Sequence, residues 1–324
     1  MAGQVAGTTD TYRMGTGGGL REDLEDKIWD LFADETWAMT NLPRVPATGT
    51  YHEWETDVLV AATNVPQIEG DDVSYSTITA PTRQGNYCQI WQKTFLVSGT
   101  LEAVKKAGRA REAARQTVKQ MRELKNDIEY TVVRNFGSSS GGSATGRAMA
   151  SMESWIVSNK AQATTTGGYT NTGFSSGTVA APTDGSTNGA VSEANLKTAL
   201  GNAWTNGGDA RVILCNTSQK AAIDAFTGQA TRYVDVARTQ QASIIGAANV
   251  YVSSYGIHTV VLHRHVRGVV ILGIDPDYWA MAWLRNPFME QMAKTGDGTK
   301  YMMRAEGTLV CRNEKASTMV VSCS

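Results

Sequence analysis

The chain has 324 residues, of which 41% are hydrophobic and 19% are charged, a composition typical of a globular protein with a buried core and about two domains. Its formal net charge is −1, which argues against a protein whose main role is to coat nucleic acid, because such proteins are usually strongly basic. The four cysteines show no C-x-x-C spacing. We therefore expect free thiols and neither a disulfide framework nor a zinc site.

Residues 1–49 are predicted to form an N-terminal arm. Residues 1–20 are rich in Gly and Thr and contain neither the basic start nor the apolar run of a secretion signal. Apolar residues at helical spacing predict a short amphipathic helix over residues 21–32: Leu24, Ile28, Leu31 and Phe32. No stretch of about 18 apolar residues occurs in the chain. We therefore expect no membrane contact, and we expect the protein to be synthesised in a cytoplasm.

Residues 50–99 predict one long extended hairpin. Residues 50–59 mix polar and apolar side chains around Trp54 in a strand-like pattern. Gly70-Asp71-Asp72 has the composition of a turn, and residues 87–97 are rich in aromatic and β-branched side chains, as expected for the returning strand.

Residues 101–135 predict a single helix of about 35 residues and about 50 Å, far beyond the usual three to four turns. Apolar residues recur mostly at steps of three or four and mark one stripe: Val104, Ala107, Ala114, Val118, Met121, Leu124, Ile128 and Val132. Neither this helix nor the hairpin can bury itself. We therefore expect a subunit that completes its folding against neighbouring copies.

The rest of the chain changes composition twice. Residues 138–190 are rich in Ser, Gly and Thr and predict exposed loop, with one helix over residues 147–159. The next region, up to residue 284, predicts an α/β unit with helices over 193–204 and 218–226 and strands over 211–215, near 250, 259–262 and 269–274. The last forty residues predict strands over 301–312 and 318–322.

Charge is unevenly divided between the hairpin and the helix. Between residues 50 and 82 every charged residue is acidic, whereas residues 105–125 contain eight basic residues and only two acidic ones. We infer that the hairpin of one subunit lies over the helix of the next, with charge guiding the register and apolar burial supplying most of the affinity. The candidate interface residues are Glu53, Trp54, Glu55, Asp57, Glu69, Asp71, Asp72, Arg109, Arg111, Arg115 and Arg122. Two other interpretations remain open, a solvated helix face and a phosphate contact.

Three patterns resemble catalytic or metal-binding motifs without predicting a site. Ser139 and Ser175 stand in Gly-x-Ser-x-Gly sequences, but both lie in Ser/Gly-rich sequence with no preceding strand, so we interpret the matches as coincidence. Glu53 and Glu55 lie two residues apart on an acidic segment, which does not establish a glycosidase pair. His263 and His265 share a strand face, yet two arginines and no third ligand stand nearby, which favours a surface or interface pair. No catalytic residue, cofactor or metal is predicted.

Four segments resemble tailed-bacteriophage major capsid proteins: residues 52–57 (HEWETD), 85–90 (GNYCQI), 93–100 (KTFLVSGT) and 306–316, which opens with EGTL and ends with RNEKA. The order of elements is also similar, and the resemblance covers most of residues 20–324. That family has the Hong Kong 97 phage-type fold. On this resemblance the chain is an α+β protein divided into an N-terminal arm (1–49), an extended loop (50–99), a peripheral-domain spine helix with a following helix (100–160), a Ser/Gly-rich insertion or surface loop (161–190), an axial domain (191–284) and peripheral-domain strands (285–324).

The resemblance also implies the function. It implies a structural protein rather than an enzyme, which self-assembles as hexamers and pentamers into an icosahedral shell around a double-stranded DNA genome. The implied partners are other copies of the chain, portal and scaffolding proteins, a decoration protein and, non-specifically, packaged DNA. Assembly in a host bacterial cytoplasm is implied as well. The alternatives are a nucleic-acid-binding protein that uses the basic helix 101–135 and a serine hydrolase.

Overall fold

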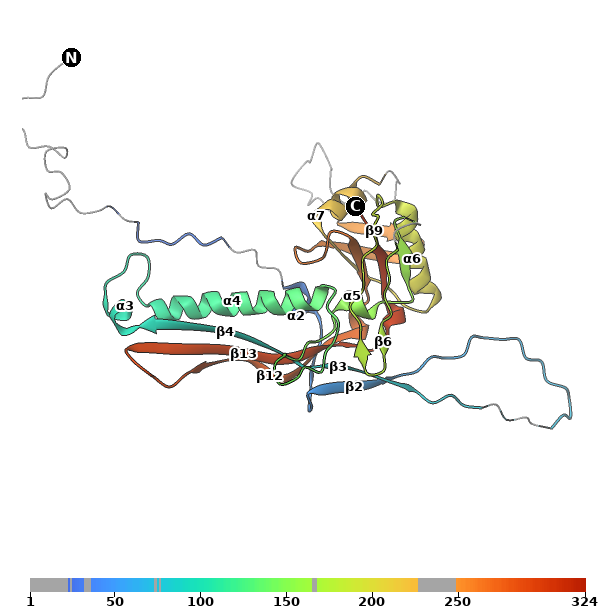
Figure 1. Cartoon of the computed structure of the whole chain (residues 1–324). Coiled ribbons are helices and arrows are strands. Elements are labelled where there is room, and N and C mark those ends of the chain that lie inside the picture. The colour runs from blue at the N-terminus through green and yellow to red at the C-terminus, as the bar shows by residue number, and fades with distance from the viewer. Residues whose placement is uncertain are drawn as a thin grey trace, which may run out of the picture.

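The computed structural model describes residues 23, 25–31, 36–72, 75, 77–164, 168–226 and 249–324. Within this part of the chain, two large sheets and a long helix, α4 (Glu112–Val133), make up the body of the molecule (Figure 1). The strand orders are β1-β12-β13-β4 and β5-β14-β11-β8-β10-β9. Helices and strands both occur throughout the chain, which confirms the predicted α+β class.

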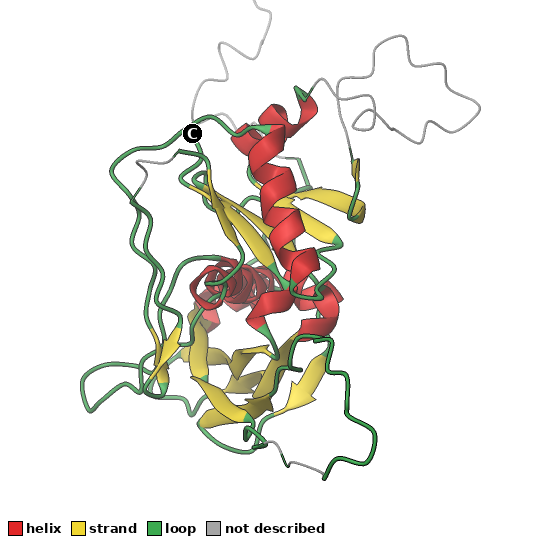
Figure 2. Ribbon diagram, turned by 90° about the vertical axis from the view of Figure 1, so that its right-hand side faces the viewer, coloured by secondary structure: helices red, strands yellow, loops and turns green. Residues whose placement is uncertain are grey.

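The four-stranded sheet carries α4 on one face. Its strands are β1 (Arg44–Pro46), β4 (Gln89–Ser98), β12 (Trp279–Gln291) and β13 (Gly298–Cys311). Alternate β4 side chains point toward the helix, since Trp91 and Val97 are buried and Lys93 Nζ lies 2.7 Å from Asp127 Oδ2 of α4. In Figure 2, α4 is seen nearly end-on above this sheet. Strand β13 confirms the strand predicted over residues 301–312.

The six-stranded sheet carries α6 (Glu193–Thr205) and α7 (Thr217–Asp224). Its strands are β5 (Lys160–Gln162), β8 (Val212–Cys215), β9 (Val250–Ser253), β10 (Gly256–Leu262), β11 (Val270–Ile274) and β14 (Thr318–Val321). These elements confirm the helices and strands predicted for residues 193–274. Strand β14 lies at the end of the region 285–324 that is predicted as peripheral-domain strands, and it pairs with β11 and β5 in this sheet rather than with β13. All four β14 residues are buried, as expected for a strand inside a covered sheet.

The prediction of a single helix over residues 101–135 is wrong. The region forms two helices, α3 (Gly99–Ala103) and α4, with a non-helical connection between them. Gly108, in the connecting segment, has a φ of +71°, which lies outside right-handed helical geometry. The Lys106 ammonium donates to three carbonyls of the α3 region, those of Leu101, Glu102 and Val104. The Glu102 carboxylate accepts from the Glu112 N–H at 3.0 Å and so caps α4. Local charged side chains therefore stabilise a break within a continuous apolar pattern.

The predicted hairpin exists only at its base. β2 (Tyr51–Thr56) pairs with β3 (Thr82–Tyr87), and we call this two-stranded element the root ribbon. The strand predicted over residues 87–97 exists as β4, but its predicted pairing within the hairpin is wrong, because β4 pairs with β13 in the four-stranded sheet. The described residues between β2 and β3, which we call loop 57–81, contain no strand and project from the body (Figure 1).

Two predicted helices are also corrected. Described residues 25–31 are not helical, while Leu24 and Phe32 lie outside the described residues. The helix predicted over 147–159 shrinks to α5 (Met152–Trp155), because its flanks bind other segments. Ala150 donates its N–H to Asn86 Oδ1 at 2.9 Å, and the Ile156 carbonyl accepts from Asn171 Nδ2 at 2.8 Å.

A buried carboxylate links the two sheets to the segment before β1. Glu129 of α4 is fully buried, and it accepts from the N–H groups of Ala38 (2.7 Å) and Met39 (3.0 Å) in α2 (Trp37–Asn41). His263, which follows β10, is equally buried, and its Nε2 lies 3.0 Å from Glu129 Oε1. Because His263 Nδ1 accepts from the His265 N–H at 3.2 Å, Nε2 carries the proton and donates to Glu129. The prediction that His263 belongs to a surface or interface pair is thus wrong, because His263 is buried inside the subunit.

We expect Glu129→Gln to lower the free energy of unfolding by about 1–3 kcal/mol, because the amide NH2 group faces a donor and leaves one buried group unpaired. Urea titration of the unassembled subunit, followed by circular dichroism, measures the change. Glu123→Gln on the same helix is the matched control, since Glu123 is partly exposed and lies 3.9 Å from Lys119. Equal losses in the two variants contradict the assigned role of Glu129.

We expect all four thiols to resist modification in the native subunit. The four cysteines are free, as predicted, and the structure buries all of them. Burial raises the pKa of Cys88 to about 11 and the pKa values of Cys215 and Cys323 to about 12, so the reactive thiolate is scarce at pH 8. Ellman's reagent is expected to label four thiols per chain in guanidinium and none rapidly without it. Rapid reaction of one native thiol contradicts this.

Candidate assembly surfaces

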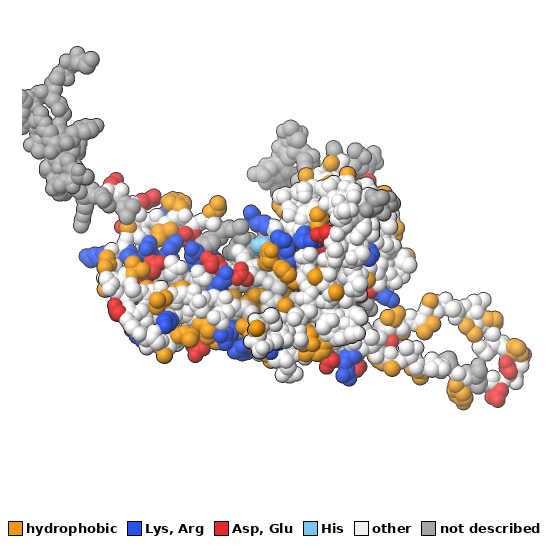
Figure 3. Space-filling model, in the orientation of Figure 1, with side chains coloured by type: hydrophobic (Ala, Val, Ile, Leu, Met, Phe, Trp, Pro, Cys, Tyr) orange, Lys and Arg blue, Asp and Glu red, His pale blue; other side chains and the backbone are white. Residues whose placement is uncertain are grey.

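Loop 57–81 exposes apolar side chains that the subunit itself does not cover. Leu59, Val60 and Ile78 are 91–95% exposed, and Val58, Val65 and Ile68 are also more than half exposed. Figure 3 shows hydrophobic side chains along both arms of the loop and acidic ones near its far end. Contiguous exposed apolar residues of this kind mark interaction surfaces in soluble proteins.

The acidic candidate residues lie on the root ribbon and on this loop. Glu53 and Glu55 project side by side from one exposed face of β2, rather than facing each other across a cleft, and Asp57 follows them. Glu69 and Asp71 stand at the turn of the loop, where the Asp71 N–H donates to the Ile68 carbonyl at 3.3 Å. Asp72 is the next residue. All six are exposed.

Trp54 is placed differently from the other candidates. It lies on the opposite face of β2 and packs against Trp155 of the same chain, with ring centroids 5.3 Å apart. Trp54 therefore attaches the root ribbon to the body.

The basic candidates on and before α4 have partners within the subunit. Arg109 pairs with Glu112, Arg111 Nε lies 3.4 Å from Glu102 Oε1, and Arg115 Nη2 lies 2.9 Å from Asp30 Oδ1. Arg122 is exposed on the same helix. The structure does not bring these residues near loop 57–81. The loop projects from the opposite end of the molecule (Figure 1). A contact between the two sets requires two copies of the chain.

The segment before α2 makes contacts and exposes apolar side chains that the sequence pattern did not reveal. Residues 25–31 run beside the α3–α4 connection, where Asp26 Oδ1 accepts from the Gly108 N–H at 3.3 Å and Asp30 binds Arg115. Ile28 packs against Gly108. Trp29 and Leu31 point outward and are 73% and fully exposed. The alternation of inward and outward residues signals an extended segment, but four apolar residues at helical spacing obscured it.

The serine motifs are parts of hairpins and not nucleophile elbows. Ser175 lies in β6 (Phe174–Ser175), which pairs with β7 (Thr178–Val179) through a turn in which Ser176 and Gly177 have φ values of 51° and 85°. Two positive φ values are typical of a type I′ hairpin turn. Ser139 forms an antiparallel bridge with Ala148. The nucleophile elbow requires a strand followed by a helix, so neither serine has the local structure that this motif requires.

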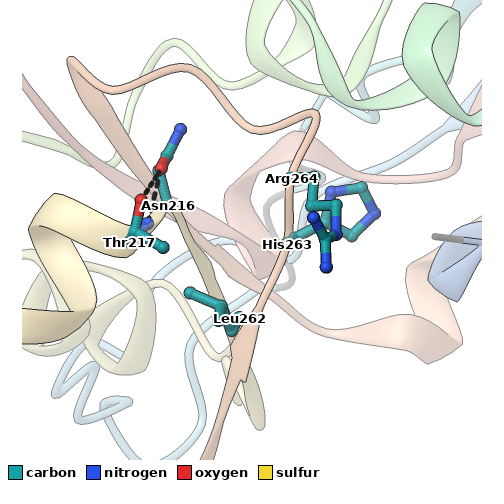
Figure 4. Close-up of a pocket in the computed structure, with 5 residues that line it drawn as sticks. All are labelled: Asn216, Thr217, Leu262, His263 and Arg264. Atoms are coloured by element: carbon teal, nitrogen blue, oxygen red, sulfur yellow. Dashed lines mark hydrogen bonds between the residues drawn. The ribbon is translucent and has the colours of Figure 1, made fainter. Parts of the chain in front are cut away.

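A cavity of about 490 Å³ lies between the start of α7 and the end of β10 (Figure 4). It is lined by Asn216, Thr217, Leu262, His263 and Arg264. Asn216 Oδ1 accepts from the Thr217 hydroxyl at 2.7 Å, and His263 is bound to Glu129, so both polar groups serve the fold. In the described part of the chain, no three His, Cys, Asp or Glu side chains are grouped to hold a metal. No helix among the described residues is long and apolar enough to cross a membrane.

Comparison with known proteins identifies the family. The sequence matches the family model of the SU10 major capsid protein over residues 4–323. No curated protein matches the chain. Among solved structures, a chain from Gordonia phage Cozz is 12% identical with a TM-score of 0.61, covering 100% of this chain and 98% of that one. The capsid of the cyanophage P-SCSP1u is 11% identical with a TM-score of 0.62, covering 98% of this chain and 100% of that one.

A third match, the capsid of a native GTA particle, is 9% identical with a TM-score of 0.63 and covers 95% of this chain and 98% of that one. At such identities the likeness concerns the fold, and it confirms the Hong Kong 97 phage-type architecture. The family model spans nearly the whole sequence, and the chain therefore belongs to the SU10 major capsid protein family.

Proposed function

We propose that this chain is the repeating subunit of an icosahedral tailed-phage shell, built from hexamers and pentamers around double-stranded DNA. The observation that carries the proposal is loop 57–81, whose apolar residues are exposed in the single subunit. Burial of each Leu, Val or Ile side chain contributes about 1.5–3 kcal/mol. Several such residues on a projecting loop supply enough free energy for a heterologous contact that repeats around a closed shell. No catalytic step is needed.

Each of the two large sheets corresponds to one domain of the proposed subunit. We assign the four-stranded sheet with α4 to the peripheral domain and the six-stranded sheet with α6 and α7 to the axial domain. Residues 1–49 act as the N-terminal arm, and the root ribbon with loop 57–81 acts as the extended loop. Supporting this, the loop leaves the body at the end of α4 that is opposite to the arm contact (Figure 1).

We also propose that Glu69 and Asp71 at the loop turn lie over the basic face of α4 in the next subunit. The side chain of Arg111 is 79% exposed despite its contact with Glu102, and Arg122 and Lys125 are exposed on α4. Each exposed charge pair contributes only about 0.2–1 kcal/mol and weakens with salt, so charge sets the register while apolar burial supplies the affinity.

The remaining partners follow from the same role. The subunit is made and assembled in a host bacterial cytoplasm and meets portal and scaffolding proteins during assembly. The phage G structure, with a TM-score of 0.55, contains decoration proteins beside its major capsid proteins, and we propose that a decoration protein binds this shell too. Packaged DNA is contacted non-specifically. No comparison supports the alternative of a separate nucleic-acid-binding protein.

Glu69→Lys combined with Asp71→Lys is expected to reduce shell yield in electron micrographs at least severalfold, because the loop turn then repels the basic helix face. The circular dichroism spectrum of the subunit is expected not to change, since both residues are exposed. Glu290→Lys, an exposed residue of β12, is the matched control. Normal shells from the double variant remove the electrostatic part of the proposal.

Replacement of Leu59, Val60 and Ile78 by Ser is expected to abolish assembly, because it removes the apolar free energy of the loop contact. Sedimentation velocity measures the loss as persistent subunits under assembly conditions. Shells that form normally from this variant contradict the proposed role of the loop itself.

A further inference from the structure

The direction of loop 57–81 depends on the root ribbon alone. The described loop residues are all exposed, and the ribbon contains only six residue pairs, from Tyr51–Tyr87 to Thr56–Thr82. An isolated two-stranded ribbon is at best marginally stable in water. Contacts that hold the ribbon must therefore determine the angle at which the loop leaves the subunit.

One face of the ribbon packs against a cluster of aromatic rings. Trp54 of β2 packs on Trp155 of α5, and Trp155 stacks on Phe174 of β6 with centroids 5.9 Å apart and planes 8° from parallel. Trp155 is only 2% exposed. Stacked aromatic rings contribute beyond their buried area and restrict relative orientation.

The other face of the ribbon is held by Tyr51. Its ring lies 4.5 Å from that of Tyr87 and covers Gly85, where an added Cβ would come within 2.6 Å of the ring. The Tyr51 hydroxyl donates to the Gly177 carbonyl at 3.0 Å, at the turn between β6 and β7. Burial, with the nearby Tyr87 and Glu53, raises the pKa of Tyr51, so the hydroxyl remains a donor at neutral pH.

The β6–β7 hairpin is itself attached firmly to the body. Val179 donates its N–H to the Ser138 hydroxyl at 2.7 Å, and the Val179 carbonyl accepts from the Ser138 N–H at 2.8 Å. Farther along the Ser/Gly-rich segment, Arg267 Nη1 donates to Asp184 Oδ2 at 2.7 Å, and the same guanidinium binds the buried Glu153 of α5. The segment is thus anchored at β7 and again just after the hairpin.

We propose that the β6–β7 hairpin, together with Trp155, is a clamp that fixes the direction of loop 57–81 by holding the root ribbon from both faces. Phe174 and Tyr51 are the positioning residues. This gives the Ser/Gly-rich segment 161–190 a role in assembly without contact with a neighbour. The inference rests on the proposed function, because the loop direction matters only where the loop reaches another subunit.

Distance measurement between two spin labels on the unassembled subunit tests the clamp directly. Labels at Asp57→Cys, just beyond β2, and at Lys197→Cys, exposed on α6, report the orientation of the ribbon, while the buried native cysteines stay unlabelled. Phe174→Ala is expected to broaden the distance distribution about twofold, because the ribbon loses one of its aromatic supports and keeps only the bonds of Tyr51 and of the buried Asn86 in β3. Tyr51→Phe, which removes only the hydroxyl, is expected to broaden it less.

Phe136→Ala is the matched control, since Phe136 is a half-exposed aromatic residue that packs on Tyr130. The clamp is overturned if Phe174→Ala and Tyr51→Phe both give the control distribution while near-ultraviolet circular dichroism shows a native fold. If Phe174→Ala does not fold, Tyr51→Phe alone decides, and an unchanged width overturns the proposal.

Electron microscopy of shells from folded variants supplies a second measurement. Loss of the clamp is expected to widen the distribution of shell diameters at unchanged subunit stability, which a purely structural role does not produce. Shells of uniform diameter from a variant with a broadened label distance contradict a role in assembly geometry. Failure of the parent protein to build any shell contradicts the proposed function instead, and the spin-label result still stands for the clamp.

Discussion

The fold depends on one buried carboxylate that accepts hydrogen bonds from three directions. Glu129 binds backbone groups about ninety residues earlier in the chain and a histidine 134 residues later. Apolar burial around α4 is non-directional, whereas three hydrogen bonds to two oxygens require a defined geometry. The carboxylate therefore fixes how the six-stranded sheet and α2 are oriented against the spine of the molecule.

Beyond this rigid body, the segments are stabilised in different ways. Residues 25–31 bind the α3–α4 connection through two aspartates and one isoleucine, yet they leave Trp29 and Leu31 exposed. Loop 57–81 has only its root attached. A subunit with a well-packed core and uncovered limbs is suited to heterologous contacts, because the limbs can bury their apolar surface on a neighbour without disturbing the core.

The sequence predicted elements well where one pattern dominates. The helices α6 and α7 and strands β8 to β11 follow from local periodicity and short apolar runs. Strand β12 was missed because its first five residues, from Trp279 to Trp283, are all buried and show no alternation. The break before α4 was missed because the apolar repeat continues across it, and only the placement of Lys106 and Glu102 explains it. The partners of Glu129 could not be inferred, since a lone glutamate in a charged helix usually faces solvent.

The pairing of the four-stranded sheet has a consequence for biosynthesis. Its strands β1 and β4 come from the first third of the chain, whereas β12 and β13 come from the last fifty residues. On the ribosome, the apolar underside of α4 can be covered early by β4 alone, and the four-stranded sheet is completed only when nearly the entire polypeptide has emerged, because contacts so distant in sequence form late. The nascent chain is therefore a natural client for chaperones, and its competence to join other copies arises only after translation ends.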